Sequence, residues 1–240
     1  MHQLSTLSGA ILDPMLRADP VGPRITYYDD ALGATGERIE LSAATLANWA
    51  AKTGNLLRDE LGAGPGSRVA ILLPAHWQTA AVLFGVWWIG AETVLEPGAA
   101  DLALCTTERL DEADSIAGEV AVLSLDPFGR PAADLPIGVT DYATAVRVHG
   151  DQIVAERHPG PALAGRSVDE VLADCQSSAA ARELTADDRV LSTAAWSRPE
   201  ELVDGLLAIL AVGASLVQVA HPDPSALPRR IETEKVTRVL

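Results

Sequence analysis

The sequence predicts an α/β fold of three layers, in which a mostly parallel sheet carries helices on both faces. The first observation is a continuous apolar run over residues 68–73, which ends at Pro74 and is typical of a strand covered on both faces. The second is the alternation of such runs with helical periodicity at the spacing of βαβ units. Because parallel neighbours need crossover connections, this alternation indicates a parallel sheet with right-handed crossovers.

The first forty residues contain a short amphipathic segment and then a predicted hairpin. Residues 25–28 and 38–41 are rich in β-branched and aromatic side chains, and residues 33–36 are expected to form the turn between them. Ser42 is placed to cap a helix, and Gly62 is placed to end it. The apolar stripe of that helix consists of Leu46, Trp49, Ala50, Thr53, Leu57 and Leu61.

Two further repeats of strand and helix follow. A helix over residues 76–90 comes after the strand that ends at Pro74, and residues 91–96 form the next strand. The third repeat comprises a strand at 102–105, a helix at 111–116 and a strand at 120–123.

Residues 126–166 are the least regular part of the chain, because prolines and glycines interrupt any long element there. A helix over 142–148 is the expected exception. We therefore interpret residues 1–240 as one α/β domain with two lobes, roughly 1–125 and 167–240, joined by this segment.

The final third regains strong periodicity. It predicts helices at 167–184, 199–212 and 224–234, which alternate with strands at 189–193, 214–219 and 236–240.

The composition and net charge of the chain disfavour some classes of function. The chain has 18 basic and 33 acidic residues in 240, a net charge of −15, which disfavours nucleic acid and an anionic membrane surface as partners. The longest apolar run, residues 80–91, is shorter than the roughly 20 residues of a membrane span. Two cysteines and no basic-then-apolar leader favour a reduced, cytoplasmic setting.

Several segments in order resemble the opening of adenylate-forming enzymes, the superfamily of acyl-CoA synthetases, peptide-synthetase adenylation domains and luciferases. The segments are Glu40-Leu41-Ser42, Gly64 to Pro74, Trp88-Ile89-Gly90-Ala91, Leu184 to Ser192, Gly205 to Val217 and Ile231 to Thr237. The likeness covers about residues 24–100 and 184–240. The chain departs from the family pattern at Ser67, where the family has Asp, and at Ala75, where it has Asn.

The resemblance implies a shortened relative of the family's large domain. The family holds pyrophosphate on a loop rich in Ser, Thr and Gly that carries a lysine, and this loop would fall just before residue 167. Here residues 156–166 contain Pro159 and Pro161, and no lysine lies between positions 53 and 234. The family's adenine-binding strand, ribose-binding aspartate and lid are expected beyond Leu240. We therefore predict no catalytic residue and no cofactor.

The other motifs in the sequence give little support for nucleotide binding, metal binding or a nucleophilic cysteine. The glycine-rich residues 62–66 lie between a helix and a strand, the reverse of a dinucleotide-binding turn. The five histidines are scattered without metal-ligand spacing, so no metal is predicted. Cys175 is expected to be a buried packing thiol.

The candidate ligand-facing residues are Ser192, Thr193 and Trp196, with Arg157 and Arg166 as cations from the irregular segment. Ser192 and Thr193 lie at the carboxyl end of a predicted strand and Trp196 follows it, where open α/β sheets place ligands. By the resemblance, Trp196 matches a region that helps to line the acyl pocket. The alternative is a capping or packing aromatic. The ligand that fits is a small hydrophobic molecule or a carboxylate.

The leading hypothesis is a degenerate, non-catalytic relative of the family that acts as a small-molecule-binding or protein-interaction module, with a protein partner or a homo-oligomer as its assembly. The alternative is one part of a split ATP-dependent carboxylate ligase that a partner chain completes. A third reading, an unrelated enzyme on the same scaffold, requires polar side chains clustered near Thr193, Trp196 and the 157–166 loop.

Overall fold

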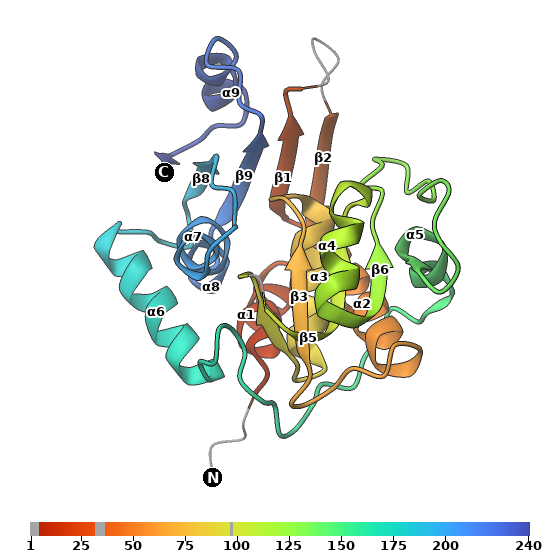
Figure 1. Cartoon of the computed structure of the whole chain (residues 1–240). Coiled ribbons are helices and arrows are strands. Elements are labelled where there is room, and N and C mark those ends of the chain that lie inside the picture. Colours follow the sequence, from red (N-terminus) through yellow and green to blue (C-terminus); the bar gives the residue numbers. More distant parts are fainter. Residues whose placement is uncertain (1–4, 32–36, 97) are drawn as a thin grey trace. The chain divides into compact units, whose positions relative to one another are not determined.

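In the computed structural model of the protein, residues 5–31, 37–96 and 98–240 are described (Figure 1). The predicted turn at 33–36 lies outside these residues.

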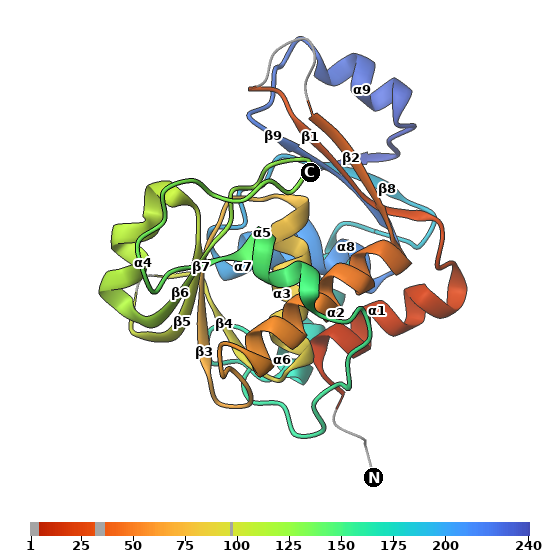
Figure 2. The ribbon, with the colours of Figure 1, turned by 90° about the vertical axis from the view of Figure 1, so that its right-hand side faces the viewer.

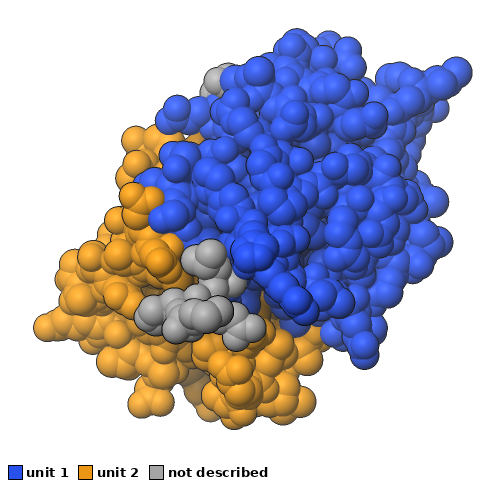
Figure 3. All heavy atoms as spheres, turned by 90° about the horizontal axis from the view of Figure 1, so that it is seen from below, with its two compact units in different colours: residues 1–9, 47–73, 78–168 blue, residues 10–46, 74–77, 169–240 orange. Residues whose placement is uncertain are grey.

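The described strands form two five-stranded sheets, one in each of two compact units (Figure 3). Unit 1 contains residues 1–9, 47–73 and 78–168, and unit 2 contains residues 10–46, 74–77 and 169–240. The segments of the two units thus alternate along the chain, while the division into lobes at 126–166 stays a prediction.

The sheet of unit 1 has the strand order β4-β3-β5-β6-β7, and all its pairs are parallel. Its strands are β3 (Arg68–Leu72), β4 (Glu92–Val94), β5 (Ala100–Cys105), β6 (Ala117–Val122) and β7 (Thr140–Asp141). The apolar run ending at Pro74 is the buried β3, as predicted. The short strand β7 was not predicted.

Helices cover both faces of this sheet (Figure 2). On one face, Ala113 of α4 (Leu110–Ile116) packs against Leu72, Cys105 and Val122. On the other face lie α2 (Ala43–Asp59) and α3 (Trp77–Trp88). The short helices η2 (Thr107–Arg109), α5 (Tyr142–Ala145) and η3 (Val146–Val148) complete the unit.

The sheet of unit 2 has the order β10-β8-β9-β1-β2. Its strands are β1 (Pro23–Asp29), β2 (Glu37–Ser42), β8 (Arg189–Ser192), β9 (Ser215–Ala220) and β10 (Arg238–Val239). The predicted hairpin is the antiparallel pair β1 and β2, and the other pairs are parallel. The hairpin joins the C-terminal strands because β1 pairs with β9.

Helices also lie on both faces of this sheet. Leu227 and Ile231 of α9 (Leu227–Thr233) pack on one face against Leu191, Val217 and Val219. Toward the other face run α7 (Pro199–Leu202), η4 (Val203–Leu207) and α8 (Ala208–Ala211), which occupy the predicted helix 199–212. The middle segment η4 is a π-helix. The remaining helices are α1 (Leu7–Ala18) and α6 (Val168–Ala181).

The structure confirms the residues that the sequence predicts at helix ends. Ser42 Oγ accepts a hydrogen bond from the Thr45 N–H at 3.1 Å, which is the predicted N-cap. Gly62, Gly90 and Gly213 follow their helices with positive φ, as helix-ending glycines do. The predicted α/β class is therefore confirmed, with the strands divided between two sheets.

Candidate functional site

The carboxyl ends of β8 and β9 place two polar side chains next to each other. Ser192, the last residue of β8, pairs in register with Gln218 of β9, so both side chains leave the same face of the sheet. Both residues are only 1% exposed. Polar side chains are uncommon inside a parallel sheet, so this pair needs an explanation beyond packing.

Both side chains hold the backbone of the loop that follows β8. Ser192 Oγ accepts from the Ala194 N–H at 3.1 Å, and Gln218 Nε2 donates to the Ala194 carbonyl at 3.0 Å. Trp196, two residues further on, has a φ of 58° and is 2% exposed. A bulky residue in the left-handed region is strained, and strain of this kind concentrates at functional sites.

The π-helix η4 brings Gly205 against this loop. A Cβ on Gly205 would lie 2.8 Å from Ala194 Cβ, 3.2 Å from Trp196 Nε1 and 3.4 Å from Ser192 Oγ. Only glycine fits without displacing Ala194. Single π turns recur at functional sites, and here the extra residue directs Gly205 toward the end of β8.

Two buried polar atoms of this group have no hydrogen-bond partner among the described residues: Trp196 Nε1, a donor, and Gln218 Oε1, an acceptor. Leaving such an atom unpaired costs about 1–3 kcal/mol, so an unpaired atom calls for a water or a ligand. We call Ser192, Ala194, Trp196, Gly205 and Gln218 the strand-end site.

The structure thus brings together two of the predicted site residues, Ser192 and Trp196, in unit 2. Thr193 lies between them in the chain and is exposed. Sequence reasoning missed Gln218 and Gly205. Gln218 carried a signal, because it is a single amide inside the apolar strand 214–219, whereas nothing local marks Gly205 as the residue of a π turn.

Arg157 and Arg166 belong to unit 1. Arg157 is exposed, and Arg166 is half-buried at a turn in which its N–H donates to the Leu163 carbonyl at 3.0 Å. The segment 156–166 that carries them runs along the end of α3 and the edge strand β4. The Trp87 indole N–H fixes it by donating to the Ala162 carbonyl at 2.8 Å.

The backbone N–H groups of residues 156–166 are all used inside unit 1. Those of 156, 160, 162, 163, 164 and 166 donate to backbone carbonyls, and those of 157, 158 and 165 donate to the carboxylates of Glu156 and Glu92. The two remaining positions, Pro159 and Pro161, have no N–H. A phosphate cradle needs several N–H groups that point at the ligand, and this segment has none to offer.

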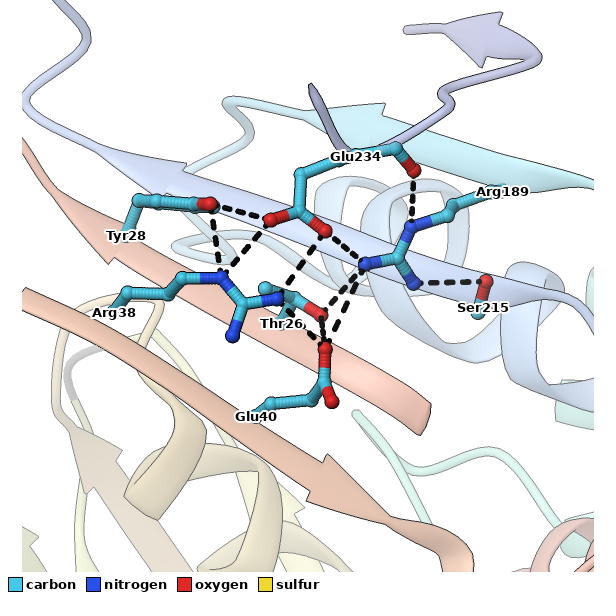
Figure 4. A network of polar contacts seen from close by, with 7 residues as sticks. All are labelled: Thr26, Tyr28, Arg38, Glu40, Arg189, Ser215 and Glu234. Atoms are coloured by element: carbon cyan, nitrogen blue, oxygen red, sulfur yellow. Dashed lines mark hydrogen bonds and ion pairs between the residues drawn. The ribbon is translucent and has the colours of Figure 1, made fainter. Parts of the chain in front are cut away.

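A second polar cluster lies on the opposite face of the unit 2 sheet, beside α9 (Figure 4). Glu234, with a side chain 6% exposed, forms ion pairs with Arg38 and Arg189 and accepts from the Tyr28 hydroxyl. Burial raises the pKa of Glu234, but the bonds from Arg38, Tyr28 and Arg189 outweigh it, and the pKa falls from 4.5 to about 2. The cluster continues through Thr26, Glu40 and Ser215. Since the ionised groups are paired, this cluster serves to hold β1, β2, β8 and the end of α9 together.

The buried histidine of unit 2 is not placed for acid–base chemistry near neutral pH. His76 is 2% exposed and meets the Tyr27 ring edge-on, with the ring centroids 4.4 Å apart. Burial lowers its pKa to about 3, although the charge of Asp29 acts in the other direction. The ring is therefore neutral at pH 7.

The described ranges contain neither a cluster of metal ligands nor a helix that could span a membrane. Residues 5–31, 37–96 and 98–240 contain no group of three or more His, Cys, Asp or Glu side chains arranged to hold a metal ion. Within the same residues, no helix combines the length and apolar character needed to cross a bilayer.

Two solved enzymes share this fold. The crystal structure of Brucella canis acyl-CoA synthetase superimposes with a TM-score of 0.80 at 18% identity, over 98% of this chain and 46% of that one. The anthranilate CoA ligase AuaEII in complex with anthranoyl-AMP gives a TM-score of 0.77 at 16% identity, over 100% of this chain and 50% of that one. The chain thus spans about half the length of these enzymes. The resemblance to adenylate-forming enzymes is confirmed in the fold.

Sequence comparison gives the family. No family model matches the chain. A Mycobacterium tuberculosis (strain ATCC 25618 / H37Rv) protein named "TIGR03089 family protein" is 79% identical over 242 residues, which cover 98% of each chain. With its acyl-CoA-ligase-like fold, the chain therefore belongs to the TIGR03089 family.

Proposed function

We propose that this chain is a non-catalytic, cytoplasmic binding module that keeps the fold of an acyl-CoA ligase, does not use ATP, and holds a small molecule at the strand-end site. The observation that carries the proposal is the segment 156–166, where every backbone N–H is already bonded within unit 1. This is the segment in which the sequence resemblance places the family's phosphate loop.

Electrostatics supports the same conclusion. Activation of a carboxylate by ATP requires cations and N–H groups on the pyrophosphate. The only lysines are Lys52 and Lys235, and the net charge of the chain is −15. The Lys52 ammonium donates to the His149 carbonyl at 2.8 Å, at the end of η3. A triphosphate therefore meets no cradle in residues 156–166, and the net negative charge of the chain disfavours its approach.

The strand-end site supports the binding part of the proposal. Ligands of α/β proteins bind at the carboxyl ends of strands, and their sites combine apolar walls with a few polar groups. Here the polar groups are the unpaired Trp196 N–H and Gln218 oxygen, and the neighbours Ala194 and Gly205 are small.

The test is ATP–pyrophosphate exchange with a panel of carboxylic acids, together with calorimetric titration of ATP. We expect no exchange and no heat of binding. Brucella canis acyl-CoA synthetase, assayed in parallel, is the positive control. Carboxylate-dependent exchange by this chain alone would show that it is an enzyme.

A second candidate function is one part of a split ligase. It is favoured by the open edge of the unit 2 sheet, where β10 leaves Val239 58% and Leu240 41% exposed. The chain also covers only 46% and 50% of the two solved enzymes, as expected of one part of a ligase. An exposed apolar edge strand can pair with a strand of another chain, because its outer backbone N–H and C=O groups are unpaired.

The split-ligase candidate predicts a partner that carries a Ser/Thr/Gly-rich loop with a lysine. Affinity capture with the wild-type chain, and with Val239→Asp as the control, identifies chains that need the β10 edge. The candidate stands only if such a chain is captured and the mixture performs ATP–pyrophosphate exchange. Light scattering of the purified chain separately measures whether it is a monomer or a homo-oligomer.

A further inference from the structure

The polar atoms of the strand-end site define what kind of group would satisfy them. Trp196 Nε1 can only donate a hydrogen bond, and Gln218 Oε1 can only accept one. Both side chains are at most 2% exposed, and both atoms lack a partner among the described residues. A ligand that pairs both atoms must therefore offer an acceptor to Trp196 Nε1 and a donor to Gln218 Oε1.

The Gln218 amide cannot turn over to offer its donor instead. Its Nε2 is held by the Ala194 carbonyl at 3.0 Å, and rotation by half a turn would place Oε1 against that carbonyl oxygen. Two acceptors facing each other repel, so the bond to Ala194 fixes Gln218 with its oxygen directed away from Ala194.

The site also offers no charge. Ser192 and Gln218 bond to the backbone of Ala194. The nearest cation along the loop, Arg198, is paired with Glu201 at 2.8 Å and is itself 67% exposed. A buried carboxylate without a cation is unfavourable, and its second oxygen would face Gln218 Oε1, another acceptor.

We propose that the strand-end site binds a neutral amide, such as a primary amide or a lactam, whose carbonyl accepts from Trp196 Nε1 and whose N–H donates to Gln218 Oε1. This inference rests on the proposed function, because it requires that the site hold a small molecule. It goes beyond that function by choosing a neutral amide over a carboxylate. In the loop after β8, the residues Thr193, Ala195 and Ser197 on either side of the buried Trp196 are exposed.

The experiment uses two pairs of probes that differ in size: acetamide with acetate, and benzamide with benzoate. The full chain, labelled with ¹⁵N, is titrated at pH 7 while the indole N–H signals are followed by NMR. The Trp196 signal is assigned as the one that is lost in Trp196→Phe. We expect an amide of at least one pair to move this signal in a saturable way and to bind about tenfold tighter than its carboxylate.

Two variants test the roles of the atoms. Trp196→Phe keeps an aromatic ring but removes the donor, and it should weaken amide binding, followed by ligand-detected NMR, about tenfold. Trp88→Phe, a buried tryptophan of unit 1, is the matched control and should leave amide binding unchanged. If Trp196→Phe does not fold, Gly205→Ala serves instead: its methyl group would lie 3.2 Å from Trp196 Nε1 and would displace Ala194, 2.8 Å away, so a folded variant should also bind the amide more weakly.

The outcomes separate the two proposals. A carboxylate that binds as tightly as its amide, or more tightly, overturns the neutral amide and leaves the binding function standing. If no probe moves the Trp196 signal, the site holds water alone, and both the amide and the proposed binding function at this site are wrong.

Discussion

Glu234 is the residue at which ionic interactions contribute most directly to the stability of unit 2. Its carboxylate is bonded by Tyr28, Arg38 and Arg189, which lie on three different strands. Arg38 also donates to Glu40 at 2.8 Å, and Arg189 donates to Thr26 at 2.9 Å. These bonds hold both guanidinium groups in place beside Glu234. Removing one partner from such a buried cluster leaves the others uncompensated.

Glu234→Gln should lower the free energy of unfolding at pH 7 by about 3 kcal/mol. The folded-state pKa, about 2, lies below the ordinary 4.5, so the charge stabilises the fold above pH 4.5 and this contribution is lost between about pH 4.5 and 2. Urea unfolding at pH 7 and at pH 3 should therefore show a smaller difference between wild type and variant in acid.

The matched control is Glu232→Gln, an exposed position in the last turn of α9, two residues before Glu234. It should leave the unfolding free energy within about 0.5 kcal/mol of wild type. An equal loss in both variants, or a difference that does not shrink in acid, would contradict the account of Glu234.

At the scale of elements, the crossing of α2 and α3 depends on a missing side chain. A Cβ on Gly85 of α3 would lie 2.8 Å from Thr53 Cβ and 2.9 Å from the Ala50 carbonyl oxygen of α2. The second of these atoms is backbone and cannot rotate away, so the two helices would have to move apart. Gly85 thus sets the distance at which α3 packs on α2.

Gly85→Ala should destabilise the protein by about 1–3 kcal/mol, even though alanine favours a helix by up to about 1 kcal/mol over glycine. Gly64→Ala is the control, because a Cβ there meets nothing within 4 Å and its φ is not positive. Thermal unfolding should show a lower Tm for the first variant and an unchanged or slightly higher Tm for the second. Equal Tm values would mean that the helices adjust without cost.

Elements could be predicted from the sequence where the signal is local. The buried β3, the cap at Ser42 and the stop at Gly62 each follow from neighbouring residues and were predicted. The pairing of β1 with β9 was not, because the sequence between them holds no signal for long-range pairing. Within the site, Ser192 and Trp196 could be predicted because they lie at the end of a strand and just after it, whereas Gln218 and Gly205 depend on strand register and on the π turn.

At the scale of the whole molecule, each unit contains one buried cysteine. Cys105 lies on β5 of unit 1, and Cys175 lies on α6 of unit 2; both side chains are 0% exposed, and neither forms a disulfide. Burial raises the pKa of the Cys105 thiol to about 11. Each cysteine therefore reports the opening of its own unit.

We expect neither thiol to react with Ellman's reagent at pH 8 until denaturant unfolds the unit that contains it. Single variants Cys105→Ala and Cys175→Ala leave one reporter each, and labelling against urea concentration then gives the stability of each unit separately. Fast labelling of either thiol without urea would show that its unit opens readily in the native protein.

The pairing of β1 with β9 also constrains how the chain can fold as it is made. Ile25 meets Leu216 in that pair, so the N-terminal hairpin leaves the ribosome long before the strand that completes its sheet. At roughly 5–20 residues per second, the wait is on the order of 10 to 40 seconds. During this time one edge of β1 is open, and the nascent hairpin is exposed to pairing with other chains or to chaperones.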